Sequence, residues 1–147
     1  MYRICKRFNF SAAHRLESSY TTKCMCGHGH NYSVDVIVSS LVLNSDGMVI
    51  DFGKLKDIIK PIIDEYDHSF MLSSELPDSV YEKNTIFLNC NPTSENIARL
   101  LFIHTQNALF EMDKTDREDT PDGQSRQVYL EKVRVYETDT SWSEYSA

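Results

Sequence analysis

Residues 24–30 read Cys-Met-Cys-Gly-His-Gly-His, so four potential metal ligands fall within seven positions. His28 and His30 are two residues apart, and in a β-strand both imidazoles would project from the same face. A third histidine, His14, ends an earlier strand-like run. Three histidine ligands leave the fourth position of a tetrahedral zinc ion open, as in catalytic zinc sites. The pattern therefore indicates a zinc enzyme.

The same segment also allows a purely structural site. Cys24 and Cys26 could join His28 and His30 in a closed Cys2His2 site with no open position, although this spacing is tighter than that of ordinary zinc fingers. His14 would then have no role. In the open site, by contrast, the Cys24 thiol stays free, and nearby zinc or His68 could convert it into a thiolate base or nucleophile.

Two alternating segments are expected to position the histidines. Residues 3–14 and 30–38 alternate between apolar and polar side chains, which is typical of β-strands. The inward parity is shared by Ile4, Phe8, Phe10, Ala12 and His14 in the first segment, and by Tyr32, Val34, Val36 and Val38 in the second. The second set continues the parity of His28 and His30. The sequence thus predicts a metal site at one end of an apolar sheet face.

The rest of the chain predicts two helices and more strand. Apolar residues recur at helical spacing from Phe52 to Tyr66, and a second helix is expected to begin near residues 91–93. Residues 112–127 are charged and turn-rich, which favours a loop; residues 128–137 alternate again, and 142–145 could add a short strand. We expect an α+β fold in which two helices pack on one face of an antiparallel sheet.

Three other acidic or paired sites could take part in chemistry. Asp67 directly precedes His68, and a carboxylate beside an imidazole suits proton transfer, although such pairs are common on surfaces. Glu137 lies on an apolar strand face, where a ligand with two parallel N–H donors would satisfy it; an ordinary charge at a strand end is the alternative. Glu95 in a first helical turn is explained by the helix dipole alone.

Composition limits the class of protein. The 147 residues fit one domain, 1–147, and 41% are hydrophobic. A net charge of −7 argues against binding to nucleic acid or acidic membranes, although Arg15 and Lys23 beside the histidine motifs could meet an anionic small substrate. We find no apolar run of transmembrane length and no signal peptide, so we expect a cytoplasmic protein with reduced cysteines.

These segments together resemble the 6-pyruvoyltetrahydropterin synthase and 6-carboxytetrahydropterin synthase family. The motifs that carry the resemblance occur in family order from residue 8 to 138. They are Phe-Ser-Ala-Ala-His-Arg (10–15), Cys24 with His-Gly-His-Asn-Tyr (28–32), Gly-Met-Val-Ile-Asp-Phe (47–52), Asp-His (67–68), Pro-Thr-Ser-Glu-Asn (92–96) and Val-Tyr-Glu-Thr (135–138).

The resemblance implies the tunnelling fold, whose subunits form barrels and usually a homohexamer built from two trimers. It implies zinc on His14, His28 and His30, with Cys24 as catalytic base and Asp67 and His68 as an accompanying proton-transfer pair. Glu137 would hold the pterin through its 2-amino and ring N–H groups. Thr93, Ser94 and Glu95 match a segment that lines the pterin pocket from a neighbouring subunit.

The substrate implied is 7,8-dihydroneopterin triphosphate. Three residues separate Cys24 from His28, which resembles the carboxy-type enzymes of queuosine and 7-deazaguanine biosynthesis. These release acetaldehyde and triphosphate and leave 6-carboxy-5,6,7,8-tetrahydropterin. His-Asn-Tyr (30–32) and Tyr-Glu-Thr-Asp (136–139) instead resemble the pyruvoyl type, which eliminates triphosphate in tetrahydrobiopterin-type synthesis. An inactive zinc-bound binding or assembly module is a third reading, because fold alone does not prove function.

Overall fold

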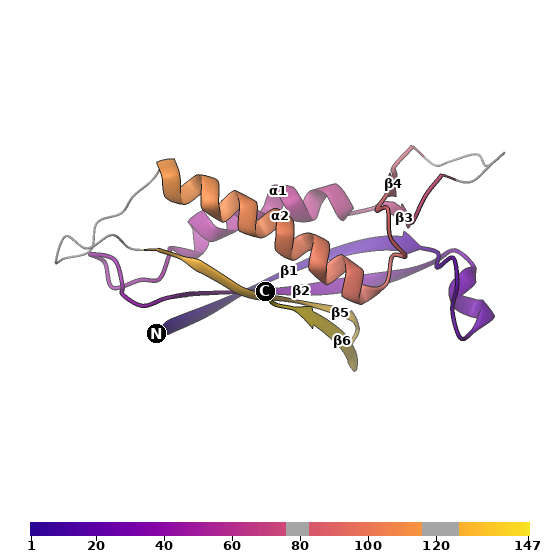
Figure 1. The fold of residues 1–147 in the computed structure, drawn as a ribbon, viewed down its shortest axis with the longest axis horizontal. Helices are drawn as coiled ribbons and strands as arrows, with labels where there is room; N and C mark the ends of the chain where they lie inside the picture. The colour runs from indigo at the N-terminus through magenta and orange to yellow at the C-terminus, as the bar shows by residue number, and fades with distance from the viewer. Residues whose placement is uncertain (76–82, 116–126) are drawn as a thin grey trace.

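The computed structural model describes residues 1–75, 83–115 and 127–147, which form one mixed sheet with two long helices (Figure 1). The strands of the described residues follow the order β4-β3-β1-β2-β5-β6 across the sheet. The elements are β1 (Tyr2–His14), a 3-10 turn η1 (Thr22–Met25), β2 (His28–Ser40), α1 (Phe52–Tyr66), β3 (Phe70–Leu72), β4 (Thr85–Phe87), α2 (Ser94–Thr115), β5 (Tyr129–Thr138) and β6 (Ser141–Tyr145).

The long strands β1 and β2 pair antiparallel along their whole length, and this pairing brings the histidines together. Ala12 lies opposite His30, and His14 lies opposite His28. The inward parity predicted from the sequence is observed, because Phe8, Phe10, Ala12 and His14 are buried. In β2 the partners on the same face, from Tyr32 to Val38, are buried as well. The histidine side chains of both strands therefore lie on the sheet face that the helices cover.

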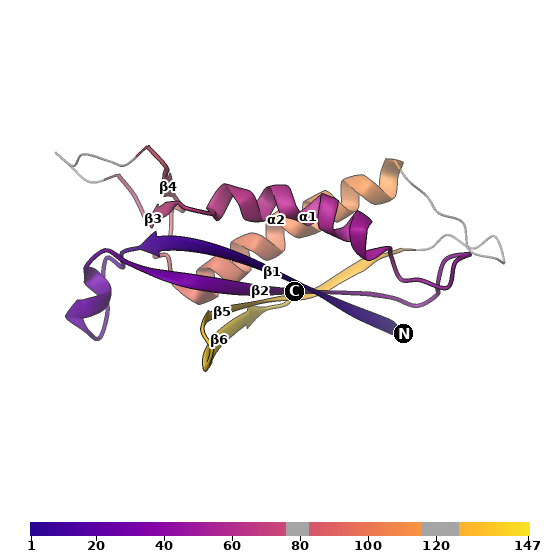
Figure 2. The ribbon, with the colours of Figure 1, turned by 180° about the vertical axis from the view of Figure 1, so that it is seen from behind.

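Both helices cover the same face of the sheet (Figures 1 and 2). Helix α1 begins where the Asp51 carboxylate accepts hydrogen bonds from the backbone N–H groups of Gly53 and Lys54. It runs through the exposed Pro61 and buries Leu55, Ile59, Ile63 and Tyr66. Helix α2 packs on β5 and β6 and buries residues such as Ile97, Leu101 and Phe102. The expected two helices on one sheet face are confirmed.

The sheet differs from the expected one by two short strands. β3 and β4 span three residues each, and they extend the sheet in parallel, β3 against β1 and β4 against β3. The sheet is therefore mixed rather than wholly antiparallel. Three residues are too few to show a strand period, so no alternation marks these strands in the sequence. The predicted loop at 112–127 begins late, because α2 continues to Thr115, and residues 116–126 lie outside the described ranges.

The opposite face of the sheet carries no helix among the described residues, and it is lined by ion pairs. Arg7 holds Asp35 through two bonds of 2.6 and 2.7 Å. Arg134 binds Glu144 at 3.0 and 2.8 Å and stacks on Trp142, with its guanidinium carbon 4.1 Å from the ring centroid. Neither described helix is long and apolar enough to cross a membrane.

Candidate metal centre and active site

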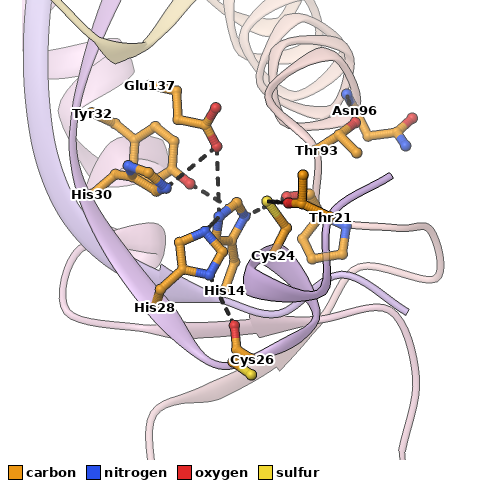
Figure 3. Close-up of polar contacts among 11 residues, drawn as sticks. His14, Thr21, Cys24, Cys26, His28, His30, Tyr32, Thr93, Asn96 and Glu137 are labelled. Atoms are coloured by element: carbon orange, nitrogen blue, oxygen red, sulfur yellow. Dashed lines mark hydrogen bonds and ion pairs between the residues drawn. The ribbon is translucent and has the colours of Figure 1, made fainter. Parts of the chain in front are cut away.

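Three imidazoles converge where β1 ends and β2 begins (Figure 3). His14, His28 and His30 each offer one ring nitrogen, and these nitrogens all lie within 4.8 Å of one another. The Nε2 atoms of His14 and His28 are 2.9 Å apart. This is the side-chain set that can hold a metal among the described residues, and it arises because three histidines share one face of two paired strands.

Backbone carbonyls select which nitrogen of each ring faces the centre. His14 Nδ1 lies 2.7 Å from the carbonyl oxygen of Pro92, and His28 Nδ1 lies 2.9 Å from that of Cys26. A carbonyl can only accept, so both Nδ1 atoms carry the proton and both Nε2 atoms keep a lone pair. Metal-binding histidines are oriented in this way by partners outside the coordination sphere.

The centre lacks internal partners for these lone pairs. Two lone pairs 2.9 Å apart repel unless a proton or cation lies between them. His30 Nε2 is buried and has no hydrogen-bond partner in the described structure. Burial also lowers the pKa of His14, which is 1% exposed, so the neutral, metal-binding form of this imidazole is favoured. The three residues therefore fit a metal ion.

Glu137 faces the same centre from β5. Its Oε1 lies 3.5 Å from Nε2 of both His14 and His30, and its side chain is 29% exposed. The carboxylate reaches this place because Tyr136 pairs with Ser33, so Glu137 comes beside Tyr32. The buried Tyr32 lies against His14, with its hydroxyl 3.4 Å from Nδ1, and burial raises the pKa of this phenol. Tyr32 thus remains a neutral donor beside a carboxylate that a ligand can reach.

The two cysteines of the motif occupy different positions. Cys24 lies in η1, is partly exposed, and its Sγ is 3.4 Å from the Thr21 hydroxyl oxygen. Cys26 is exposed, and in Figure 3 its side chain points away from the imidazoles while its carbonyl accepts the His28 hydrogen bond. Among the described residues the metal-type cluster contains histidines and no cysteine. The closed Cys2His2 arrangement is therefore not formed.

Asp67 and His68 form a fixed pair at the edge of β1. The Ser11 backbone N–H donates to Asp67 Oδ1 at 2.9 Å, and the His68 N–H donates to the Ser11 carbonyl at 2.6 Å. The other Asp67 oxygen lies 3.0 Å from His68 Nδ1. The Ser11 amide, and then His68, hold the pKa of Asp67 below its usual range. The imidazole is 78% exposed, and within the described residues the pair forms no hydrogen bond or ion pair with Cys24 or with the three histidines.

The start of α2 closes one side of the centre. Thr93 precedes the helix: its carbonyl accepts from the Ile97 N–H at 2.9 Å, and its hydroxyl accepts from the Asn96 N–H at 3.4 Å. Ser94 is half-buried and Glu95 is exposed. The segment touches the centre through the Pro92 carbonyl, a contact that sequence reasoning missed. No residue type signals such a role, because every residue carries a carbonyl.

Comparison with known proteins agrees with this geometry. A family model described as 6-pyruvoyl tetrahydropterin synthase matches residues 3–147. The chain is 31% identical over 157 aligned residues to the 6-carboxy-5,6,7,8-tetrahydropterin synthase of Haemophilus influenzae, with 99% of each chain covered. It is 33% identical over 117 residues to the enzyme of that name from Rickettsia bellii, covering 75% of this chain and 81% of the relative.

Solved structures give the same picture. The 6-pyruvoyl tetrahydropterin synthase of Caenorhabditis elegans superposes with a TM-score of 0.70 and 27% identity, covering 99% of this chain and 95% of that one. The Plasmodium falciparum protein of the same name shares the fold, with a TM-score of 0.73, 21% identity and coverage of 98% and 96%. Fold and histidine centre together define a pterin synthase. The chain belongs to the 6-pyruvoyl tetrahydropterin synthase family and is an enzyme of that type, as its motifs predicted.

Proposed function

We propose that residues 1–147 form a single zinc-dependent domain that converts 7,8-dihydroneopterin triphosphate to 6-carboxy-5,6,7,8-tetrahydropterin, acetaldehyde and triphosphate. Atom balance requires the uptake of one water molecule. The observation that carries the proposal is the convergence of three imidazole Nε2 atoms beside a reachable carboxylate. The relatives named 6-carboxy-5,6,7,8-tetrahydropterin synthase support the carboxy product. This product places the enzyme in queuosine and 7-deazaguanine biosynthesis.

His14, His28 and His30 would hold the zinc, because each offers a ring nitrogen to the same point and His30 Nε2 has no hydrogen-bond partner in the described structure. When bound, zinc would act as a Lewis acid that makes the substrate's side-chain hydroxyls more acidic. The Pro92 and Cys26 carbonyls keep the His14 and His28 rings in the productive orientation. The protein supplies the rest of the chemistry from its own side chains.

Glu137 would anchor the pterin ring. An ionised carboxylate accepts two parallel hydrogen bonds, and the pterin presents a matching pair in its 2-amino and ring N–H groups. The 29% exposure of the side chain leaves its oxygens open to such a ligand. Because Glu137 lies against His14 and His30, a pterin ring bound to Glu137 would place the side chain of the substrate at the metal.

Cys24 would act as the base that moves a proton at the substrate's side-chain carbons. The Thr21 hydroxyl lies 3.4 Å from its sulfur and can donate to a thiolate. Asp67 would orient His68 through Nδ1 and leave Nε2 for proton exchange. Since this pair forms no hydrogen bond or ion pair with Cys24 or the three histidines among the described residues, we assign it to the site of a neighbouring subunit in a homohexamer of two trimers.

Assembly would also bring Thr93, Ser94 and Glu95 to a neighbouring pterin pocket. The helix-free, ion-paired face of the sheet suits the polar interior of a barrel formed between copies. All four cysteines are free, which fits a reducing compartment, so we propose a cytoplasmic location. The substrate is a small molecule, and no nucleic acid or membrane partner is proposed.

Triphosphate elimination alone, giving 6-pyruvoyltetrahydropterin, is the second candidate. It is favoured by the name of the matching family and by the full-length likeness to the Caenorhabditis elegans enzyme. An inactive zinc-bound assembly module is the third. These candidates differ in product, so the product is the measurement to make.

The test is mass spectrometry of the products after zinc-loaded protein is incubated with 7,8-dihydroneopterin triphosphate. We expect 6-carboxy-5,6,7,8-tetrahydropterin together with acetaldehyde. The pyruvoyl product would replace the first candidate with the second. A folded, zinc-bound assembly that forms neither product would leave the binding module.

A further inference from the structure

The side chain of Asn91, just before α2, binds the loop that follows β1. Its Oδ1 accepts a hydrogen bond from the Glu17 backbone N–H at 2.9 Å, and its Nδ2 lies 3.3 Å from the Ser18 carbonyl oxygen. One amide therefore uses both its acceptor and its donor on two neighbouring residues. These contacts join positions more than 70 residues apart, so they form a tertiary link rather than a local turn.

The main chain of Asn91 belongs to the turn that orients His14. The Thr93 N–H donates to the Asn91 carbonyl at 2.8 Å and closes a γ-turn around Pro92, whose ring fixes φ. Asn96 Nδ2 donates to the same carbonyl at 2.9 Å, which ties the turn to the first turn of α2. The Pro92 carbonyl then accepts from His14 Nδ1 at 2.7 Å. Asn91 is thus part of the wall that holds a metal-centre imidazole.

The loop that Asn91 binds is also attached to the turn that carries Cys24. The Leu16 N–H, one residue before Glu17, donates to the Cys24 carbonyl at 2.9 Å. Because η1 contains no buried residue, its position depends on such backbone contacts rather than on core packing. The Glu17 carboxylate accepts from the Ser74 hydroxyl at 3.1 Å, but that contact leads to the end of β3 and away from the turn that faces His14.

We propose that Asn91 is a positioning residue of the active site, because its side chain fixes the Cys24 thiol relative to the His14 imidazole. The role of Cys24 as the base rests on the proposed function, whereas the hydrogen bonds that connect the two residues do not. A base displaced by about 1 Å lowers turnover by as much as about 10²-fold. Glu137 lies on β5, outside this set of contacts, so binding of the pterin ring should be preserved. The expected signature is a loss in kcat rather than a rise in KM.

The test compares three variants of the zinc-loaded protein with wild type. Asn91→Ala removes both side-chain hydrogen bonds, and Asn91→Asp keeps the acceptor for the Glu17 N–H but loses the donor to Ser18. Asn107→Ala removes an exposed asparagine from α2 and is the matched control. Each protein is measured for Tm, for zinc content, and for kcat and KM with 7,8-dihydroneopterin triphosphate.

A second readout follows the position of Cys24 without turnover. The cysteines are alkylated with a trifluoromethyl reagent, which reaches Cys24 because this residue is partly exposed. Its fluorine resonance is identified by its absence from Cys24→Ala. Cobalt in place of zinc is paramagnetic and shifts a nearby resonance according to its distance from the metal. The difference in fluorine shift between cobalt-loaded and zinc-loaded protein therefore reports how Cys24 lies relative to the metal centre.

We expect Asn91→Ala to lower kcat by about 10- to 100-fold, with KM and zinc content close to wild type, and to change the cobalt-induced shift of Cys24. Asn91→Asp should lie between the two, and Asn107→Ala should match wild type. A wild-type kcat and a wild-type shift in Asn91→Ala would overturn the proposal even if Tm fell, because Asn91 would then act on stability alone. If Asn91→Ala does not fold, the same result in Asn91→Asp would overturn it. A changed shift in Asn91→Ala, with no turnover by wild type, would support the positioning role and refute the proposed function.

Discussion

Replacing Cys24 with alanine separates the catalytic reading of the histidine motif from the structural one. Cys24 lies in η1, a turn without buried residues, and its Sγ lies 3.4 Å from the Thr21 hydroxyl oxygen. The three imidazoles converge without any sulfur ligand. The substitution therefore removes a thiol from the site without removing a metal ligand or a part of the core.

The magnitudes follow from these positions. A substitution outside the core and away from special contacts changes the free energy of unfolding by about 0.5 kcal/mol or less. For a chain of this length that is a shift in Tm of roughly 2 °C at most. Loss of a positioned acid–base group lowers the rate of proton transfer by about 10²- to 10⁴-fold. Turnover should thus fall by orders of magnitude while folding is preserved.

The assay needs three readouts on the same preparation: zinc per chain by elemental analysis, oligomeric state by light scattering, and product formation by chromatography. Cys26→Ala is the matched control, because the carbonyl that orients His28 is backbone and survives the change. It should keep zinc, assembly and turnover. Zinc loss from Cys24→Ala would revive the closed Cys2His2 site, and unchanged turnover would refute Cys24 as the base.

Three further perturbations test separate parts of the site and fold. Zinc at 100 times its Kd should raise the free energy of unfolding of the wild-type protein by about 2.7 kcal/mol and so raise its Tm. His30→Ala should abolish this rise, which is measured by thermal unfolding with added zinc or with a chelator. Glu137→Gln should raise KM roughly tenfold or more with zinc content unchanged, since one carboxylate oxygen is lost to the pterin; kinetics and metal analysis on one sample check it. The hydrogen bonds from Arg7 hold the pKa of Asp35 below its ordinary value of 3.8. The ionised Asp35 therefore stabilises the fold fully above pH 3.8, and this stabilisation is lost as pH falls through the lower pKa of the folded state. Asp35→Asn should therefore flatten the acid limb of stability in urea unfolding, and an unchanged limb would contradict this account.

Local periodicity was enough to predict that His14, His28 and His30 share the inward face of the strands that carry them. His14 shares the parity of Phe8 and Phe10, and His28 and His30 share the parity of the buried β2 residues. A strand turns successive side chains to opposite faces by its covalent geometry. Once apolar residues mark the inward face, the histidines on that face must point inward as well. The pairing of β1 with β2 then places His14 opposite His28.

The arrangement of Asp67 and His68 was only half predictable. Adjacent carboxylate and imidazole are visible in the sequence, but their place beside Ser11 depends on β3 pairing with β1. A three-residue strand shows no period, so this pairing left no signal.

By itself the sequence determined the residue types at the centre, their common strand face and the two helices that cover it, because side-chain direction and helix period are properties of the local chain. Only the tertiary structure decided that the Pro92 and Cys26 carbonyls leave the Nε2 atoms facing the centre, and that Glu137 meets His14 and His30. These contacts join segments far apart in the chain. Their register is set by burial summed over the whole core, which no single segment encodes.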